Sequence, residues 1–223
     1  YTGLILTQLI SILKGSPVTN TMLEVATSSN LWVNLFIMVL CAPVAEELIF
    51  RKLLIDRLAQ YGEGVAVLFS GLMFGLFHGN LNQFVYAFVL GLCFGFIYVK
   101  TGNIRYTIGL HMLVNFLGSV LGVAILKWLG DDFLSIASDP AGMMSYMTGN
   151  FGKLIVYFIY IFLLLGVAIA GIILFIVNLK KIRFLPGMNT LPKGKRFSTT
   201  VLNVGMALYM IVWIVIIIVQ LLQ

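Results

Sequence analysis

Residues 35–51 read LFIMVLCAPVAEELIFR. The run is apolar up to the pair Glu46 and Glu47, with Pro43 as its one interruption. A carboxylate at membrane depth is costly, so an acidic pair at the end of such a run marks a functional site by default. This stretch therefore predicts a membrane helix that carries chemistry.

The composition of the whole chain supports a membrane setting. Of 223 residues, 61% are hydrophobic and 10% are charged, whereas a soluble domain keeps roughly a quarter of its residues charged. A net charge of +6 raises the question of a nucleic-acid partner, but the basic residues lie in short loops between apolar stretches, where they set membrane topology. We expect the lipid bilayer as a partner, and no nucleic acid.

Apolar windows of membrane-spanning length divide the chain into helices. They predict an all-α, polytopic transmembrane bundle with about seven spans, the first of them truncated. We expect residues 1–223 to form a single integral membrane domain, with a catalytic core at about 31–126 and C-terminal helices at about 153–222. The predicted spans are a stub ending near Leu13 and residues 31–50, 64–78, 83–99, 104–126, 153–178 and 201–222.

The loop charges predict the orientation of these spans. The segment from Lys180 to Arg196 is basic, whereas the preceding loop carries Asp131, Asp132 and Asp139. Because basic loops stay in the cytoplasm, the former loop is predicted inside and the latter outside. We expect a multi-pass protein of the plasma membrane.

Both histidines of the chain also fall in apolar spans. Gly62 is the midpoint between Glu46 and His78, so in an antiparallel hairpin each lies about 16 residues, or ~24 Å, from the tip. The two side chains can then face each other, and His111 reaches a similar depth from the turn at Gly102. The arithmetic predicts one site built by three helices, in a cavity open to the cytoplasm.

Spacing within each motif adds detail. Glu47 and Arg51 are four residues apart on one helical face and are predicted to pair, which leaves Glu46 free to act. Phe74 lies one turn before His78 and can wall or orient its imidazole. His111 and Asn115 share a helical face and offer two polar groups to one point.

In this order, the patterns EExxxR from Glu46, FxxxH ending at His78 and HxxxN from His111 resemble the CPBP family of CAAX proteases and bacteriocin-processing enzymes, also called Abi. The resemblance implies an intramembrane endopeptidase acting on a membrane-associated peptide or lipidated protein, by CAAX-type or by bacteriocin or signal-peptide processing. It further implies that Glu46 and His78 activate a water, while His111 and Asn115 stabilise the oxyanion. Its supporting residues are Glu47, Arg51 and Phe74.

Three alternatives stay open on the sequence. Two histidines and one glutamate also suit a catalytic zinc, with Glu46, His78 and His111 as ligands, although we favour a glutamate mechanism without a cofactor. A non-catalytic membrane immunity or sensor protein would keep the fold without the reaction. A proton-coupled transporter would stagger its ionisable residues in depth. The oligomeric state cannot be read from the sequence.

Overall fold

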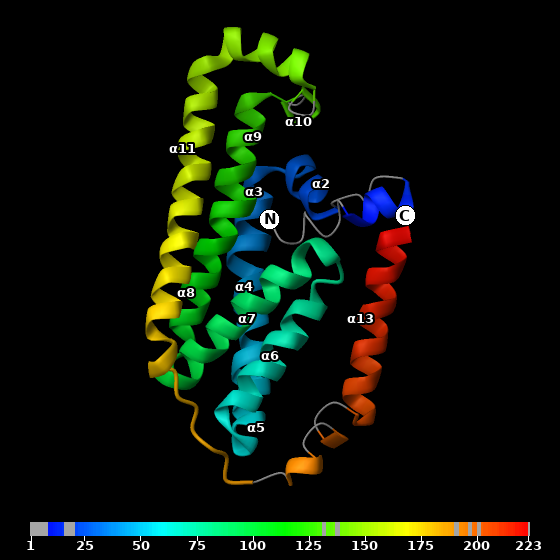
Figure 1. Ribbon diagram of the computed structural model, residues 1–223, viewed down its shortest axis with the longest axis vertical. Helices are drawn as coiled ribbons and strands as arrows, with labels where there is room; N and C mark the ends of the chain where they lie inside the picture. Colours follow the sequence, from blue (N-terminus) through cyan, green and yellow to red (C-terminus); the bar gives the residue numbers. More distant parts are fainter. Residues whose placement is uncertain are drawn as a thin grey trace. The chain divides into compact units, whose positions relative to one another are not determined.

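The computed structural model describes residues 9–15, 21–130, 133–136, 139–189, 192–195, 198–199 and 202–222. Every regular element within these ranges is a helix (Figure 1). The predicted all-α class is therefore confirmed. Asp131, Asp132, Arg196 and residues 4–8 of the predicted stub lie outside the described residues.

Five helices in the described ranges are long and apolar enough to cross a membrane. A sixth predicted span is present as α6 (Glu63–Phe77), but its 15 residues rise only about 22 Å, which is short of a hydrocarbon core of ~30 Å. The described part of the stub is helical at residues 9–14. The chain is thus a multi-pass membrane protein, and the predicted count of seven is approximate. The five long helices are Leu31–Tyr61, Leu81–Thr101, Ile104–Leu129, Pro140–Lys181 and Val204–Leu222.

Contacts between residues group the chain into two units. The first consists of Tyr1–Glu24, Leu40–Met112 and Phe184–Gln223, and the second of Val25–Val39 and Leu113–Arg183. Residues that are distant in sequence therefore belong to one unit.

The helix that carries the acidic pair changes its winding on both sides of it. The stretches η1 (Asn34–Cys41) and η2 (Leu48–Ile55) are π-helical, and α4 (Ala42–Glu47) between them is α-helical, with Pro43 in its first turn. Pro43 lies inside the continuous helix Leu31–Tyr61 and has no N–H to donate, so it interrupts the backbone hydrogen bonding close to where the winding changes from π to α. The helix continues through α5 (Asp56–Leu58) and η3 (Ala59–Tyr61).

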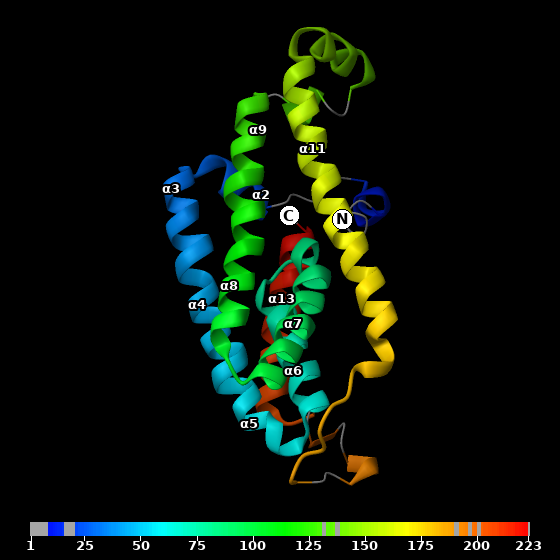
Figure 2. The same cartoon turned by 90° about the vertical axis from the view of Figure 1, so that its left-hand side faces the viewer.

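A tight helical hairpin forms the centre of the first unit. The predicted turn at Gly62 is present between η3 and α6, with a φ of +114°. A second turn, at Gly79 with a φ of +63°, joins α6 to α7 (Leu81–Thr101), and these two helices lie side by side (Figures 1 and 2). A Cβ atom added to Gly91 would lie 2.8 Å from the Cα of Gly71. The backbones therefore approach as closely as small residues permit. A left-handed turn at Gly102 then leads into α8 (Ile104–Asn115).

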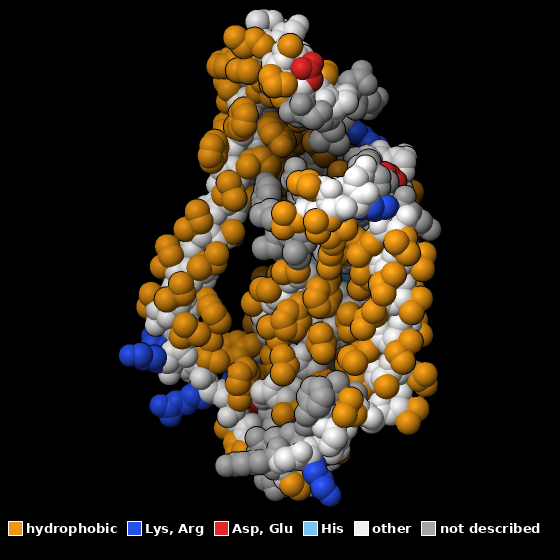
Figure 3. Space-filling model, turned by 45° about the vertical axis from the view of Figure 1, so that its right-hand side comes forward, with side chains coloured by type: hydrophobic (Ala, Val, Ile, Leu, Met, Phe, Trp, Pro, Cys, Tyr) orange, Lys and Arg blue, Asp and Glu red, His pale blue; other side chains and the backbone are white. Residues whose placement is uncertain are grey.

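The C-terminal helix α13 (Val204–Leu222) packs on α6 in the same unit. The Tyr209 hydroxyl donates to the carbonyl of Met73 at 2.7 Å, and the rings of Trp213 and Phe77 meet edge to face at 5.2 Å. On the face drawn in Figure 3, hydrophobic side chains cover the lengths of the helices. Such a surface suits lipid rather than water.

The second unit is held by polar contacts between apolar helices. It includes α3 (Leu31–Val33), η4 (Phe116–Gly122) and α9 (Val123–Leu129). The Asn34 amide donates to the carbonyls of Ala26 at 2.8 Å and Ser119 at 3.1 Å, and such bonds hold helices together in lipid. Its other helices are α10 (Phe133–Ile136), α11 (Pro140–Asn178), η5 (Leu179–Lys181) and α2 (Thr21–Ser28), of which the residues from Val25 onward belong to this unit.

Candidate active site

The candidate site contains a buried ion pair. Glu47 Oε2 lies 3.0 Å from Arg51 Nε, and both side chains are 0% exposed. The predicted pairing of these two residues is present. Neither atom makes a well-aligned hydrogen bond among the described residues, so the contact is mainly electrostatic. A buried ion pair of this kind needs further polar partners to offset its desolvation.

His111 joins the two acidic residues. Its Nδ1 lies 3.0 Å from Glu47 Oε1, and its Nε2 lies 3.6 Å from Glu46 Oε2. A carboxylate that faces an arginine is an acceptor, so we assign the proton on Nδ1 of His111, which donates to Glu47. Nε2 is then directed at Glu46. Within the described residues, the histidine that contacts a Glu46 oxygen is therefore His111.

His78 is fixed by its own helix. It follows the last residue of α6, and its Nδ1 lies 2.8 Å from the carbonyl oxygen of Phe74. A carbonyl can only accept, so Nδ1 carries a proton. In the neutral imidazole, Nε2 is consequently the basic nitrogen, available to a proton or a ligand.

The ring of Phe74 contacts three members of the site. Its centroid lies 4.9 Å from that of His78 and 5.5 Å from that of His111, both edge to face. The guanidinium carbon of Arg51 lies 4.8 Å from the same centroid, within the range of a cation–π interaction. Phe74 thus orients both histidines, beyond the one that sequence spacing assigned to it.

Two residues that the sequence reasoning missed complete this cluster. Arg51 Nη1 donates to Ser70 Oγ at 3.1 Å, and Ser70 Oγ donates to the Phe50 carbonyl at 2.8 Å. The ring of Phe94, on α7, lies 5.5 Å from His111 and 5.7 Å from the Arg51 guanidinium carbon. Ser70 is four residues before Phe74, so its position on the same face of α6 was a signal; Phe94 had none.

A polar chain follows His78 into α7. Asn80 Nδ2 donates to the His78 carbonyl at 2.8 Å and to Gln83 Oε1. Gln83 Nε2 in turn donates to the Tyr86 hydroxyl at 2.8 Å, which leaves the hydroxyl proton of Tyr86 free to donate elsewhere. These three residues tie the end of α6 to the start of α7.

Asn115 belongs to the second unit. It is the last residue of α8, one turn after His111, and its Nδ2 donates to the carbonyl of Met38 at 2.8 Å. One amide hydrogen is therefore engaged in holding helices together. The role of Asn115 toward an oxyanion stays a prediction.

The residues that a catalytic zinc would use in the alternative hypothesis, Glu46, His78 and His111, are not gathered around one point in the described part of the chain. His111 directs both ring nitrogens at carboxylates, and tetrahedral zinc needs at least three protein donors converging on one point. Among the described residues, no group of three or more His, Cys, Asp and Glu side chains is placed to hold a metal ion.

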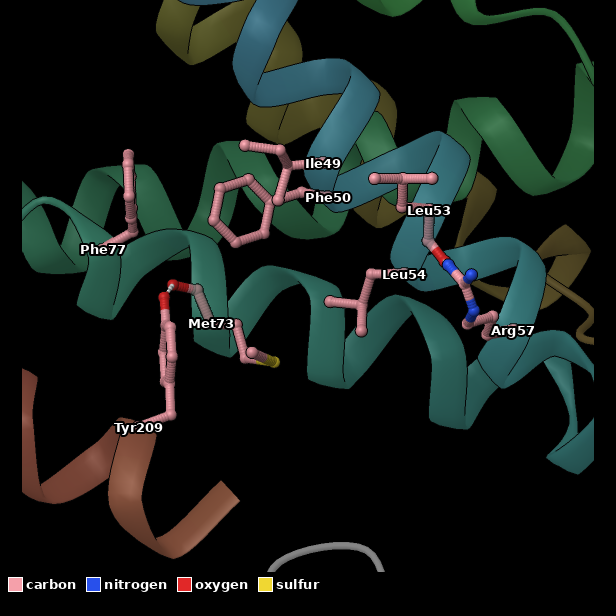
Figure 4. A pocket seen from close by; sticks show the side chains of 8 residues that line it. All are labelled: Ile49, Phe50, Leu53, Leu54, Arg57, Met73, Phe77 and Tyr209. Atoms are coloured by element: carbon pink, nitrogen blue, oxygen red, sulfur yellow. Dashed lines mark hydrogen bonds between the residues drawn. The ribbon is translucent and has the colours of Figure 1, made fainter. Parts of the chain in front are cut away.

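An apolar groove of about 300 Å³ lies beside the cluster, between η2, α6 and α13 (Figure 4). Phe50 connects the groove to the cluster, because it lines the groove and its ring meets the ring of Phe74 at 5.3 Å. Arg57 is the one charged residue of the lining. The groove is lined by Ile49, Phe50, Leu53, Leu54, Arg57, Met73, Phe77 and Tyr209.

Residues 28–117 match the family model described as type II CAAX prenyl endopeptidase Rce1-like. The resemblance to CAAX proteases is thereby confirmed for this segment. Two curated relatives are named as a membrane peptidase and as a membrane-embedded CAAX protease. The protein named "Putative membrane peptidase YdiL" of Bacillus subtilis is 32% identical over 74 residues, which are 33% of this chain and 30% of that protein. "Membrane-embedded CAAX protease MroQ" of Staphylococcus aureus is 26% identical over 152 residues, 65% of this chain and 59% of that protein.

This chain thus spans less than two thirds of either relative. No solved structure matches it.

Proposed function

We propose, from the match of residues 28–117 to the CAAX prenyl endopeptidase model, that this protein is an intramembrane endopeptidase. Its substrate is a membrane-associated protein or peptide precursor. One observation carries the proposal: Glu46 and His111 meet at 3.6 Å in a cluster that also contains the fully buried ion pair of Glu47 and Arg51. A membrane protein bears the cost of burying such groups where they have a function.

The reaction we propose is general-base hydrolysis. Glu46, with Nε2 of His78, removes a proton from water, and the resulting hydroxide attacks the carbonyl carbon of the scissile bond. The tetrahedral oxyanion is stabilised by donors from His111 and Asn115. The C–N bond then breaks, and the proton taken from water passes to the departing amine.

The charges of the cluster support this transfer of a proton to Glu46. Glu46, Glu47 and Arg51 together carry one net negative charge when ionised, and an isolated charge is costly in a low-dielectric interior. The proton that Glu46 takes from water makes the cluster neutral, and Nε2 of His111 lies 3.6 Å from Glu46, where it can share that proton.

We propose that the reaction needs no metal ion, because a glutamate and two histidines supply its proton transfers. A chelator should therefore leave proteolysis unchanged. Glu46→Gln should abolish proteolysis without changing the metal content. If metal and activity are lost together from that variant, the glutamate mechanism is wrong.

The apolar groove supports a membrane-associated substrate. Its wall residue Phe50 contacts the ring of Phe74, which packs on both histidines, and Arg57 lies within its lining. A peptide with an apolar segment or lipid anchor could use this surface while its polar backbone reaches Glu46. Whether processing is of CAAX type or of bacteriocin or signal-peptide type is left to the experiment.

Quantitative peptidomics of membranes and medium tests the proposal while the substrate is still unidentified. Cells with the native protein are compared with cells carrying Glu46→Gln at equal expression. The matched control is Glu24→Gln, the same chemical change at an exposed position on α2. We expect one precursor to accumulate uncleaved in Glu46→Gln alone, and its new terminus in native cells to identify the scissile bond.

An unchanged peptide profile, with both proteins folded and present, would overturn the proposal. If Glu46→Gln then also retained the full cellular phenotype, the protein would act as a non-catalytic immunity or sensor protein. Proton flux that depends on Glu46 in proteoliposomes would instead indicate a transporter.

A further inference from the structure

We infer that Ser70 is a positioning residue that sets the orientation of His111 through Arg51 and Glu47. The inference rests on the proposed protease function for its catalytic meaning, but the geometry that it predicts can be measured without any substrate. Ser70 lies outside the three motifs that identified the site, and its hydroxyl has no exposed surface.

Ser70 holds Arg51 by accepting and donating at once. It accepts from Nη1 at 3.1 Å and donates to the Phe50 carbonyl at 2.8 Å. Arginine has five N–H donors and no acceptor, and Nη2 and Nε make no well-aligned hydrogen bond among the described residues. The bond from Nη1 to Ser70 is thus the one well-formed hydrogen bond of this guanidinium within that part of the chain.

The carbonyl that Ser70 uses belongs to η2, the π-helical stretch Leu48–Ile55. The hydroxyl therefore connects α6 to the same helix that carries Glu46 and Glu47. The faces of the Phe74 and Phe94 rings attract the guanidinium. They do not fix its rotation, because cation–π attraction acts on the whole charge and does not select one N–H group. Ser70 supplies the missing directional contact.

The orientation then passes from Arg51 to His111. Arg51 contacts Oε2 of Glu47, which leaves Oε1 to accept from Nδ1 of His111 at 3.0 Å. An acceptor on Nδ1 fixes the tautomer of a histidine and the direction of its other nitrogen. Nε2 is thereby kept facing Glu46.

Ser70→Ala should therefore leave the fold in place and loosen the site. Arg51 loses its directional acceptor and can rotate within its aromatic surroundings, and Glu47 follows it. We expect proteolysis to fall about 10- to 100-fold, the range for loss of a hydrogen bond to a charged group or of a partner that orients an active-site residue.

The two histidines make a direct test practical. Protein labelled with ¹⁵N in histidine alone gives imidazole signals from His78 and His111 only, and His78→Gln assigns them. We expect Ser70→Ala to move the Nδ1 signal of His111 and to leave that of His78 nearly unchanged. Ser70→Thr, which keeps the hydroxyl, should restore it.

Thr107→Val is the matched control. Thr107 is also 0% exposed, but its hydroxyl bonds to the carbonyl of Ile104 in its own helix. It should change neither the His111 signal nor proteolysis. If Ser70→Ala leaves the His111 signal at its native position, the inference is wrong. It is equally wrong if Ser70→Ala and Ser70→Thr are alike in the His111 signal, in proteolysis and in thermal unfolding.

The proteolysis assay distinguishes failure of this inference from failure of the proposed function. Proteolysis lost in Glu46→Gln but unchanged in Ser70→Ala would reject the role of Ser70 and keep the protease. A moved His111 signal with no proteolysis in the native protein would keep the geometric role of Ser70 and reject the protease.

Discussion

Arg51 shows how strongly one side chain of this protein depends on its partners. It is fully buried, pairs with Glu47 and lies over the rings of Phe74 and Phe94. Arg51→Met removes the cation and leaves a buried carboxylate without its partner, which costs about 3–5 kcal/mol in comparable pairs. We expect a corresponding fall in the free energy of unfolding, measured by denaturant titration in detergent.

The double variant Arg51→Met with Glu47→Leu separates charge from packing. It removes both ions, so most of the lost stability should return. Because Nδ1–H of His111 then lacks an acceptor, a deficit of about 1–3 kcal/mol should remain. A double variant as unstable as Arg51→Met alone would instead assign the loss to the packing of the arginine side chain.

Local spacing was sufficient for part of the site and insufficient for the rest. The pairing of Glu47 with Arg51 follows from four residues of helix, and the turn at Gly62 follows from its glycine. The spacing placed His78 opposite Glu46, whereas the structure brings Nε2 of His111 to 3.6 Å from Glu46, since counting residues from a turn gives depth but not rotation about the helix axis. The π-helical stretches on both sides of Glu46 alter that rotation, and no sequence pattern predicted them.

Among the elements, α6 and α7 depend on glycine at their crossing. A methyl group at Gly91 would meet the Cα of Gly71 at 2.8 Å, and a backbone atom cannot move aside as a flexible side chain can. We expect Gly91→Ala to lower the free energy of unfolding by about 1–3 kcal/mol, as overpacking does. The control is Gly109→Ala in α8, where a Cβ meets nothing within 4 Å and helix propensity predicts a gain of up to about 1 kcal/mol. Equal effects of the two would contradict the close crossing.

Where α6 begins and α7 ends, Glu63 and Lys100 form a contact whose strength depends on pH. Glu63, at the start of α6, pairs with Lys100 and accepts from the Leu185 N–H at 2.9 Å. Burial raises the pKa of Glu63, but the hydrogen bonds from Lys100 and Leu185 and the charge of Lys100 outweigh it, so the pKa lies below its ordinary value of 4.5. A lowered pKa stabilises the fold above the unfolded-state value, and this stabilisation is lost as pH falls through the folded-state value.

Glu63→Gln should therefore be less stable than the native protein near neutral pH, and the difference should shrink on acidification below about pH 4.5. Thermal unfolding in detergent between about pH 3 and pH 7 measures it. A difference that is constant across this range would mean that the amide loses packing or hydrogen bonding and not charge.

At the scale of the whole molecule, segments distant in sequence contribute to one site. The matched segment ends at residue 117, yet Tyr209 from α13 forms part of the apolar groove and bonds to Met73. Hydropathy predicted α13 as a span but not its neighbour, because a uniformly apolar helix carries little information about which face is covered. The ion-pair cluster could be anticipated from local motifs, whereas its surroundings depend on contacts between distant segments.

The orientation of the chain in the membrane is the remaining large-scale prediction. If basic loops stay inside, residue 194 faces the cytoplasm and residue 145, before the apolar part of α11, faces outward. Cys41 and Cys93 are the only cysteines, so replacing both by alanine gives a background for Gly194→Cys and Ser145→Cys. A membrane-impermeant maleimide should label Ser145→Cys in intact cells, and Gly194→Cys only after the membrane is opened, while detergent exposes both. The opposite pattern would place the basic loop, and the predicted opening of the catalytic cavity with it, on the outer side.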